Sequence, residues 1–329
     1  MALVEVNDLK VWYPVKNGWF KAKQFVRAVD GVSFEIEAGT TMGLVGESGC
    51  GKSTLGRALV KLEEPCGGGF TIGGVNLAEL KGGELRKARK KFQMIFQDPY
   101  GSLNPRLTIF SAIDEVLQLH TAFDRQQRVD RVAELLELVG LEADVMHRYP
   151  HQFSGGQRQR IGIARALAAE PDIIIADEPV SALDVSVQAQ IINLLIKIQK
   201  QTGTAFLFIA HDLAVVEHIS KNIIVMYLGK IVESGPAKEL CAAPVHPYTQ
   251  ALLSAIPTID PESKRKRIIL EGDVPSPINP PAGCSFHPRC PLATDICRQQ
   301  TPKLEEVSPS GQRSACFRNE ESRKKWKKD

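Results

Sequence analysis

The sequence has no apolar run long enough to cross a membrane. Its longest apolar runs, residues 173–176 and 205–210, have the length of strands, whereas a membrane-spanning helix needs about 20 apolar residues. Residues 1–8 contain acidic side chains and lack the apolar core of a signal peptide. We therefore expect a chain that is cytoplasmic or bound to a membrane from the cytoplasmic side.

The composition also lacks the marks of a nucleic-acid-binding or a secreted protein. The formal net charge of the 329 residues is only +3, which is too small to indicate nucleic acid as a partner. Seven cysteines in a chain of this kind favour metal binding or chemistry over disulfides. The hydrophobic share of 43% is ordinary for a globular protein, and the length allows one large domain or one domain with an appendage.

Strand and helix patterns alternate along most of the chain. Residues 1–45 alternate apolar and polar side chains, which predicts antiparallel strands and a last strand over residues 41–45. Apolar spacing predicts helices at about 55–62, 106–152, 157–169 and 188–200, and strands at 173–176 and 204–210. This alternation indicates a mainly parallel α/β sheet. After about residue 255 prolines and cysteines become frequent, which indicates an appendage.

Residues 46–53 read Gly-Glu-Ser-Gly-Cys-Gly-Lys-Ser and lie between a predicted strand and a predicted helix. This is the G-x-x-x-x-G-K-S pattern in its usual context. The glycines let backbone N–H groups point at phosphates, and the helix N-terminus adds a positive dipole. Lys52 can reach the β- and γ-phosphates, Ser53 can offer a hydroxyl to Mg²⁺, and Thr54 is a further phosphate donor. We interpret Cys50 as a small side chain that fits the loop, not as a nucleophile.

Asp177 and Glu178 follow the apolar strand 173–176. The end of such a strand is where open α/β sheets place ligand groups. Asp177 suits Mg²⁺, directly or through water, and Glu178 suits a general base or an orienter of the attacking water. Alone, the pair could equally be a cap ahead of Pro179, but the phosphate loop upstream favours the catalytic interpretation.

Residues 154–157, Ser-Gly-Gly-Gln, open a predicted helix. Such a helix N-terminus can bind an anion or can simply be capped. After the phosphate loop and Gln97, and ahead of Asp177, Glu178 and His211, the segment matches the signature motif of ABC-type ATPases, with Phe153 in place of the usual Leu. The chain therefore resembles that family. The resemblance implies an ATPase in which two domains sandwich the nucleotide, with Ser154 and Gly156 of one domain facing Lys52, Ser53 and Asp177 of the other.

The resemblance assigns roles to further residues. Gln97 would meet Mg²⁺ and the attacking water, His211 would contact the γ-phosphate, and Asp184 would lie in a loop that crosses the dimer interface. Tyr13 would stack on adenine while Trp12 faces away. The nucleotide-binding set is then Tyr13, Gly46, Glu47, Ser48, Gly49, Cys50, Gly51, Lys52, Ser53, Thr54, Ser154, Gly155, Gly156, Gln157 and Asp184. The Mg²⁺ set is Ser53, Gln97 and Asp177, and the catalytic set is Glu178, His211 and Gln97.

Three longer segments narrow the resemblance. Residues 99–106, 179–190 and 246–253 are similar to the dipeptide/oligopeptide and nickel importer branch, closest to its dipeptide "F"-type ATPase subunit. This similarity covers nearly the whole chain. It implies a RecA-like P-loop core with an antiparallel β subdomain in residues 1–255. A helical subdomain would occupy about 98–156, and a Cys-rich C-terminal extension would occupy 256–329.

The same resemblance implies an assembly. The chain would be a peripheral ATPase on the cytoplasmic face of the inner membrane, where ATP hydrolysis drives peptide uptake. Its partners would be two integral-membrane permease subunits, a second ATPase subunit that is a paralogue or another copy, and, indirectly, an extracytoplasmic peptide-binding protein. No nucleic acid is expected. Whether the solute is a peptide or nickel stays open, because this chain does not touch it.

Four cysteines of the extension, Cys284, Cys290, Cys297 and Cys316, are spaced C-x5-C-x6-C-x18-C in a proline-rich segment. Four thiols in a segment with few large apolar residues suggest a metal that organises it. Zinc usually prefers C-x2–4-C pairs, and the sequence has none. The resembling branch carries a [4Fe-4S] cluster here, which implies these four residues as its ligands. His287 is a possible ligand that a four-cysteine site does not need.

Two other classes of function compete with transport. A non-transport ABC ATPase acting on DNA or ribosomes tends to carry a long coiled-coil insertion or two ATPase halves, and this sequence shows neither. A metal-sensing regulator would use the ATPase only secondarily. An effect of iron removal on ATP turnover would favour that third class.

Overall fold

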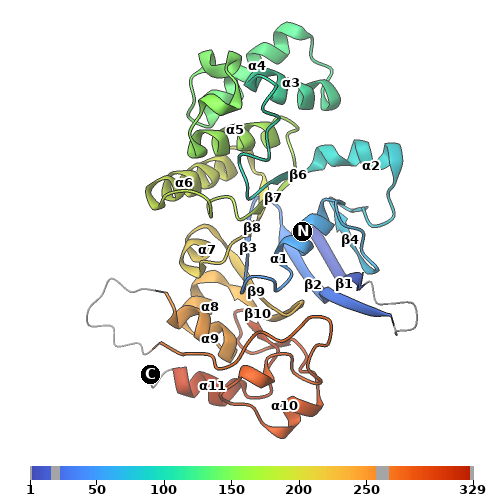
Figure 1. Cartoon of the computed structure of the whole chain (residues 1–329), viewed down its shortest axis with the longest axis vertical. Coiled ribbons are helices and arrows are strands. Elements are labelled where there is room, and N and C mark those ends of the chain that lie inside the picture. Colours follow the sequence, from blue (N-terminus) through green and yellow to red (C-terminus); the bar gives the residue numbers. More distant parts are fainter. Residues whose placement is uncertain (1, 16–22, 257–266, 327–329) are drawn as a thin grey trace. The chain divides into compact units, whose positions relative to one another are not determined.

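The computed structural model describes residues 2–15, 23–256 and 267–326 (Figure 1). These residues form two compact units that alternate along the chain. Unit 1 contains the described residues of 2–5, 35–40 and 71–209, and unit 2 contains those of 6–34, 41–70 and 210–326. Residues 257–266, which follow the predicted domain border at 255/256, lie outside the described residues.

Unit 1 is built around three parallel strands. Strand β7 (Ile173–Asp177) lies between β6 (Phe92–Ile95) and β8 (Ala205–Ile209), with Ala176 opposite Phe208. Every residue of β7 and β8 is buried, as expected for parallel strands that are covered on both faces. The two strands predicted from their apolar runs are confirmed, and Asp177 lies at the carboxyl end of the middle strand.

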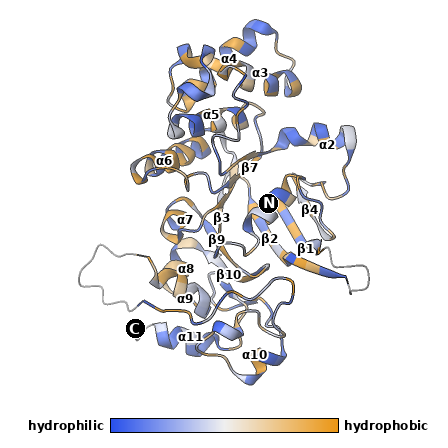
Figure 2. Cartoon of the chain, viewed as in Figure 1, coloured by the Kyte–Doolittle hydropathy of each residue, from blue (hydrophilic) through white to orange (hydrophobic). Residues whose placement is uncertain are grey.

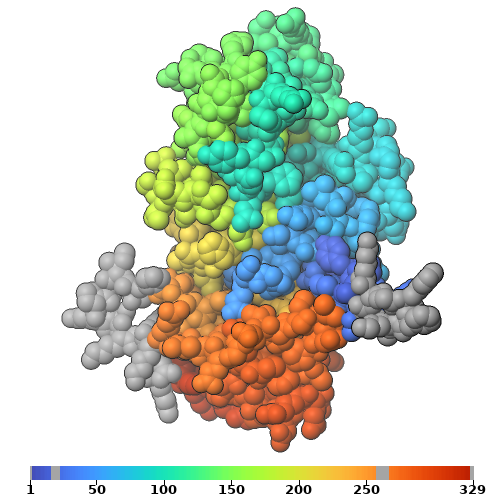
Figure 3. All heavy atoms as spheres, viewed as in Figure 1, coloured from blue at the N-terminus to red at the C-terminus, as the bar shows by residue number. Residues whose placement is uncertain are grey.

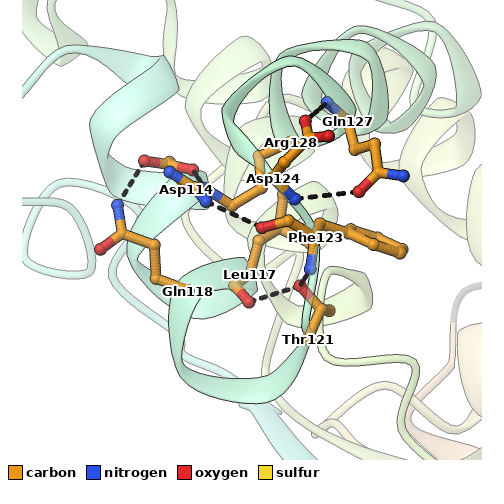
Figure 4. Close-up of polar contacts among 8 residues, drawn as sticks. All are labelled: Asp114, Leu117, Gln118, Thr121, Phe123, Asp124, Gln127 and Arg128. Atoms are coloured by element: carbon orange, nitrogen blue, oxygen red, sulfur yellow. Dashed lines mark hydrogen bonds and ion pairs between the residues drawn. The ribbon is translucent and has the colours of Figure 1, made fainter.

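The helices of unit 1 follow the predicted positions with shifted ends. The region predicted as helical over 106–152 contains two α-helices, α3 (Ile109–His120) and α4 (Arg125–Leu138), and then the short 3-10 turns Ala143–His147 and Pro150–Gln152. The break between α3 and α4 has a local cause (Figure 4), because Asp124 and Gln127 form a reciprocal capping box that starts α4. Arg128 of α4 then binds Asp114 of α3 at 2.5 Å. This unit also contains β5 (Val75–Asn76), α2 (Gly82–Ala88), the 3-10 turn Arg89–Lys91, α5 (Gly155–Leu167) and α6 (Val185–Thr202).

Unit 2 combines parallel and antiparallel pairing. Strand β3 (Thr41–Val45) runs parallel to β9 (Asn222–Tyr227), and β9 pairs antiparallel with β10 (Lys230–Pro236). The C-terminal extension then adds β12 (Arg313–Ser314), antiparallel to β10, and β11 (Glu305–Glu306). The predicted mainly parallel sheet is therefore found here with an antiparallel edge, and part of that edge comes from the extension.

The rest of unit 2 consists of long strands and helices. It holds most of β1 (Ala2–Val15), β2 (Gln24–Glu37) and β4 (Gly67–Ile72), together with α1 (Lys52–Leu59), α7 (Leu213–Ile219), α8 (Ala237–Ala242), α9 (Pro247–Ser254), α10 (Asp295–Gln299) and α11 (Asn319–Trp326). Figure 2 shows α11 as largely hydrophilic, and the orange to red atoms in Figure 3 belong to the described part of the extension, residues 267–326. None of the helices in the described ranges is long and apolar enough to span a membrane.

Candidate nucleotide-binding site

The phosphate loop of unit 2 connects β3 to α1 and requires glycine at two positions. Gly46 has φ +154°, and a Cβ there would lie 2.2 Å from the carbonyl oxygen of Met226. Gly51 has φ +106°, and a Cβ there would lie 2.0 Å from the carbonyl oxygen of Ala28. Both the backbone conformation and the close approach exclude a side chain. The loop thus curls tightly back against its own unit.

Lys52 is held inside this loop. Its side chain is buried, and Nζ donates to the carbonyl oxygens of Gly46 at 2.7 Å and Glu47 at 3.1 Å. Helix α1 begins at Lys52, earlier than the predicted residue 55, because Gly51 serves as its N-cap. The start of a helix and an ammonium group together suit an anion, so this end of α1 is a candidate phosphate site.

Cys50 lies buried within the loop. Its side chain is buried, and a Cβ on Gly46 would lie 2.7 Å from the Cys50 sulfur. Burial raises the pKa of the Cys50 thiol, although the nearby Lys52 opposes the shift. A thiol in this setting packs within the loop and is a poor nucleophile at neutral pH.

Unit 1 brings Gln97 and Glu178 together at the end of the middle strand. Gln97 Nε2 donates to Glu178 Oε2 at 2.8 Å. Glu178 has φ +45°, a left-handed conformation that is uncommon for a residue with a side chain. Its backbone N–H donates to Ile209 O at 3.0 Å, next to the buried Asp177. Two of the three predicted catalytic side chains are therefore in direct contact beside the predicted Mg²⁺ ligand.

Ser154 caps helix α5 in the structure. The Gln157 N–H donates to Ser154 Oγ at 3.3 Å, and the Ser154 N–H donates to Gln157 Oε1 at 3.0 Å, which is a capping box. Ser154 is exposed, whereas Gly156 lies against α6, where an added Cβ would be 2.5 Å from Val187. Of the two alternatives for this segment, a helix cap and an anion site, the structure contains the cap. The serine remains exposed while it caps the helix.

The remaining predicted residues lie at the ends or edges of elements. Asp184 is exposed at the N-cap position of α6 and its side chain makes no capping bond. His211 is exposed just ahead of α7. Tyr13 is half-buried on β1, and burial raises the pKa of its hydroxyl, which lies close to Thr54 of α1. The neighbouring Trp12 instead donates to Asp30 at 3.2 Å.

The predicted site residues divide between the two units. Unit 2 contains Tyr13, residues 46–54 and His211, whereas unit 1 contains Gln97, residues 154–157, Asp177, Glu178 and Asp184. Each group has the local geometry described above.

Two residues that the sequence analysis did not assign contact the phosphate loop. Tyr248 of α9 accepts a hydrogen bond from the Glu47 N–H at 2.7 Å. Arg289 donates to both Glu47 carboxylate oxygens, at 2.7 and 3.2 Å. Tyr248 lies in segment 246–253, which the sequence analysis used only as evidence for the family resemblance. Arg289 belongs to no local sequence pattern. The cysteines that flank Arg289 were the only signal nearby.

The four cysteines of the extension lie in one neighbourhood. Burial raises the pKa of the Cys316 thiol to about 12, and the thiols of Cys284, Cys290 and Cys297 add to that shift. The Cys284 N–H donates to Cys297 O at 2.8 Å. Even so, among the described residues no three His, Cys, Asp or Glu side chains are grouped as a metal site. The cluster implied by the resemblance stays a prediction.

Comparison with known proteins identifies the family. The ABC transporter family matches residues 29–181, and the family described as oligopeptide/dipeptide transporter, C-terminal region, matches residues 232–297. The chain is 51% identical to the dipeptide transport ATP-binding protein DppF of Haemophilus influenzae, over 96% of each chain. It is 52% identical to the oligopeptide transport ATP-binding protein AppF of Bacillus subtilis, over 94% of this chain and 95% of that one.

A solved structure agrees with this assignment. The dimeric ATP-binding cassette MJ0796, in a post-hydrolysis state with ADP and Pi, matches with a TM-score of 0.63 and 31% identity, over 71% of this chain and 98% of that chain. The fold is thus the RecA-like cassette of ABC ATPases. This chain belongs to the ABC transporter family of ATP-binding proteins, in the branch that carries the oligopeptide/dipeptide transporter C-terminal region. It is an ATPase that uses ATP and Mg²⁺.

Proposed function

We propose that this chain hydrolyses ATP to power the uptake of dipeptides or oligopeptides through a membrane ABC importer. The observation that carries the proposal is the similarity to peptide-transport ATP-binding proteins over both the cassette and the C-terminal extension. The chain would bind peripherally at the cytoplasmic face of the inner membrane, beneath two permease subunits. An extracytoplasmic peptide-binding protein would supply the solute.

In the proposed site, residues of unit 2 bind the triphosphate. The first-turn N–H groups of α1 and the Lys52 ammonium would hold the β- and γ-phosphates, and Thr54 would add a hydroxyl donor. Ser53, Asp177 and Gln97 would hold Mg²⁺, which when bound neutralises charge on the phosphates. Tyr13 would stack on adenine, and His211 would contact the γ-phosphate.

Glu178 is proposed to act on the attacking water. Its carboxylate oxygen lies 2.8 Å from Gln97 Nε2, so the amide fixes the direction in which the carboxylate accepts a proton. A positioned general base contributes about 10²–10⁴ in rate. The proposed role of Gln97 is therefore to orient both Glu178 and the water that Glu178 activates.

The complete site is proposed to need two cassettes. Ser154 is exposed while it caps α5, and a helix N-terminus of this type can bind an anion. Ser154, Gly155, Gly156 and Asp184 of one cassette would contact nucleotide held by a second cassette. The second cassette would be another copy or a paralogue. Closure on ATP and reopening after hydrolysis would move the permeases.

A deletion strain tests the transport proposal. A strain that lacks this chain, and that requires an amino acid supplied only as a dipeptide, should regain growth with the wild-type gene but not with Lys52→Ala. Free amino acid should restore growth in every case. Restored growth with Lys52→Ala would contradict the proposed use of ATP. Normal dipeptide-dependent growth of the deletion strain, together with loss of nickel uptake, would replace peptide by nickel as the solute.

We further propose that Cys284, Cys290, Cys297 and Cys316 hold a [4Fe-4S] cluster in an extension that spans 256–329, following an ATPase domain of 1–255 with its helical subdomain at about 98–156. The support is the four-thiol donor set, its shared neighbourhood, and the Arg318 N–H that donates to the Cys316 sulfur at 3.3 Å. Such N–H···S bonds favour the thiolate that iron requires. Anaerobically purified protein should be brown and contain iron and acid-labile sulfide, whereas colourless protein with one zinc per chain would replace the cluster by a zinc site.

A further inference from the structure

Glu47 of the phosphate loop is held by two side chains from the C-terminal third of the chain. Arg289 Nη1 and Nη2 donate to Glu47 Oε2 and Oε1 at 2.7 and 3.2 Å, and the Tyr248 hydroxyl accepts from the Glu47 N–H at 2.7 Å. One contact holds the carboxylate and the other holds the peptide group. Together they fix Glu47 at both its side chain and its backbone.

The contact with Arg289 is of the strong kind. The Arg289 side chain is only 9% exposed and that of Glu47 is 27% exposed, so water screens the pair poorly. A two-pronged guanidinium–carboxylate pair also fixes direction, which a lysine could not do in the same way. The pair therefore positions the loop and is unlike the exposed ion pairs elsewhere in this unit.

The residues that hold Glu47 are themselves packed rigidly. Tyr248 and Phe286 are fully buried, and with Tyr227 they form an aromatic cluster with ring centroids 4.7 to 5.4 Å apart. Phe286 lies three residues before Arg289, and both lie between Cys284 and Cys290. The position of the guanidinium is thus set by α9 and by residues 284–316, the cysteine segment.

Glu47 in turn contacts the lysine that binds phosphate. The Glu47 carbonyl oxygen accepts from Lys52 Nζ at 3.1 Å. A continuous series of contacts therefore runs from Arg289 and Tyr248, through Glu47, to Lys52. Movement of the cysteine segment would therefore shift the Glu47 peptide group that Lys52 contacts.

We propose that Arg289 and Tyr248 are positioning residues for ATP binding, which hold the phosphate loop in its binding conformation through Glu47. This inference rests on the proposed role of Lys52. It assigns to the C-terminal extension an effect on nucleotide affinity that acts through Glu47, whereas the sequence analysis predicted only a metal-organised appendage there. The effect should appear in ATP affinity more than in the chemical step.

Equilibrium binding of a fluorescent ATP analogue with Mg²⁺ to the full chain tests the proposal. Arg289→Ala should raise the Kd about tenfold, because a buried charged hydrogen-bonding partner is lost. Arg289→Lys should recover part of the affinity, since it keeps the charge without the two-pronged geometry. In steady-state hydrolysis KM should rise while kcat stays within about twofold, since the lost interaction acts on binding. The matched control is Lys10→Ala, which removes a surface pair with Asp8 at 2.7 Å in the same unit, and it should leave the Kd unchanged.

A double-mutant cycle separates positioning from general destabilisation. Glu47→Ala and Arg289→Ala should each raise the Kd, and the double variant should be no weaker than the worse single variant. Additive effects, or wild-type Kd in folded Arg289→Ala, would overturn the proposal. If Arg289→Ala fails to fold, Tyr248→Phe keeps the buried ring and removes only the acceptor for the Glu47 N–H, and it should raise the Kd by about threefold. Wild-type affinity in Tyr248→Phe would then overturn the proposal. Lys52→Ala should lose binding in every background, so retained binding there would contradict the proposed site itself.

Discussion

The phosphate loop, residues 46–53, and the cysteine segment, residues 284–316, both belong to unit 2 but are stabilised in different ways. Backbone geometry holds the loop, through two glycines that exclude a Cβ and a buried lysine that binds loop carbonyls. Long-range contacts hold the cysteine segment, including the packing of Phe286 and the pair between Arg289 and Glu47. The comparison teaches that the loop conformation is set largely by its own glycines and lysine, with Glu47 held from outside by Arg289 and Tyr248, whereas the segment depends on distant residues and on the metal proposed to bind it.

The largest effect is expected on catalysis, in unit 1. Glu178→Gln should lower the rate of ATP hydrolysis by about 10²–10⁴, because it removes a positioned general base. Gln keeps the size of the side chain and a hydrogen-bonding partner for Gln97, so ATP binding should persist and the closed dimer should accumulate. Phosphate release and sedimentation with ATP measure the two effects. Near-normal hydrolysis would exclude Glu178 from this role.

The next largest effect concerns the anchoring of the extension. Glu233 is fully buried on β10 and accepts from the N–H groups of Val245 and His246 and from Gln312 of the extension. Burial raises the pKa of Glu233 to about 7 from 4.5. Between pH 4.5 and pH 7, Glu233 keeps its proton in the folded chain, whereas in the unfolded chain Glu233 has released it. Stability should therefore fall as the pH rises from about 4.5 to about 7, by up to about 3 kcal/mol.

Glu233→Gln removes this titration, so comparison with the wild type separates it from the titration of His246. Burial lowers the pKa of His246 to about 3, which makes stability rise with pH between about 3 and 6.5 in both proteins. The difference in free energy of unfolding, wild type minus Glu233→Gln, should therefore decrease from pH 5 to pH 8. Urea denaturation at both pH values measures it. A constant difference would show that Glu233 does not titrate in this range.

A smaller effect, on dimerisation, is expected for residues 154–157. Ser154→Ala should leave ATP binding to the monomer unchanged and weaken ATP-driven dimerisation about tenfold, because a hydroxyl donor to phosphate is lost. The variant also loses a helix cap. Asp124→Ala removes the corresponding cap of α4 and should leave dimerisation unaffected. Loss of monomer binding in Ser154→Ala would instead mean that Ser154 serves its own cassette.

An effect on ATP affinity no larger than that of Arg289→Ala is expected when one of the four cysteines in this segment is replaced. Cys290→Ser should remove the bound iron and make the extension sensitive to protease, because the proposed cross-link is lost. ATP binding should survive, with a Kd raised no more than in Arg289→Ala, since the segment acts on the loop only through Glu47. Proteolysis and ATP binding of the same sample give both results. Loss of all binding would mean that the loop depends on the cluster for its fold.

The sequence predicted the elements whose causes are local. The strand at 173–176, the helix capped by Ser154 and the phosphate loop each follow from apolar runs, capping residues or glycines within a few positions. Apolar spacing predicts the start of α1 three residues too late, because the helix begins directly after its N-cap, Gly51, and not at its first apolar residue. The sequence analysis assigned Gln97 and Glu178 to the same attacking water, but it did not predict the direct contact between them, which no local pattern encodes.

What the sequence could not predict depends on pairs of residues far apart in the chain. Arg289 and Glu47 are 242 positions apart, and neither position is unusual in its own surroundings. The strand β12 pairs with β10 through Glu233 and Ser314, yet a run of two residues gives no strand pattern. Such contacts arise from the folded sheet, which a single sequence does not reveal.

The central claim is that ATP hydrolysis by this chain drives peptide uptake. The most direct measurement follows phosphate release and uptake of a labelled dipeptide in the same proteoliposomes, which contain this chain, its ATPase partner, the two permeases and the binding protein. The account predicts that the wild-type chain supports both processes and that Glu178→Gln abolishes both. Hydrolysis by the wild-type assembly without uptake of any dipeptide or oligopeptide, or uptake that persists with Glu178→Gln, would contradict it.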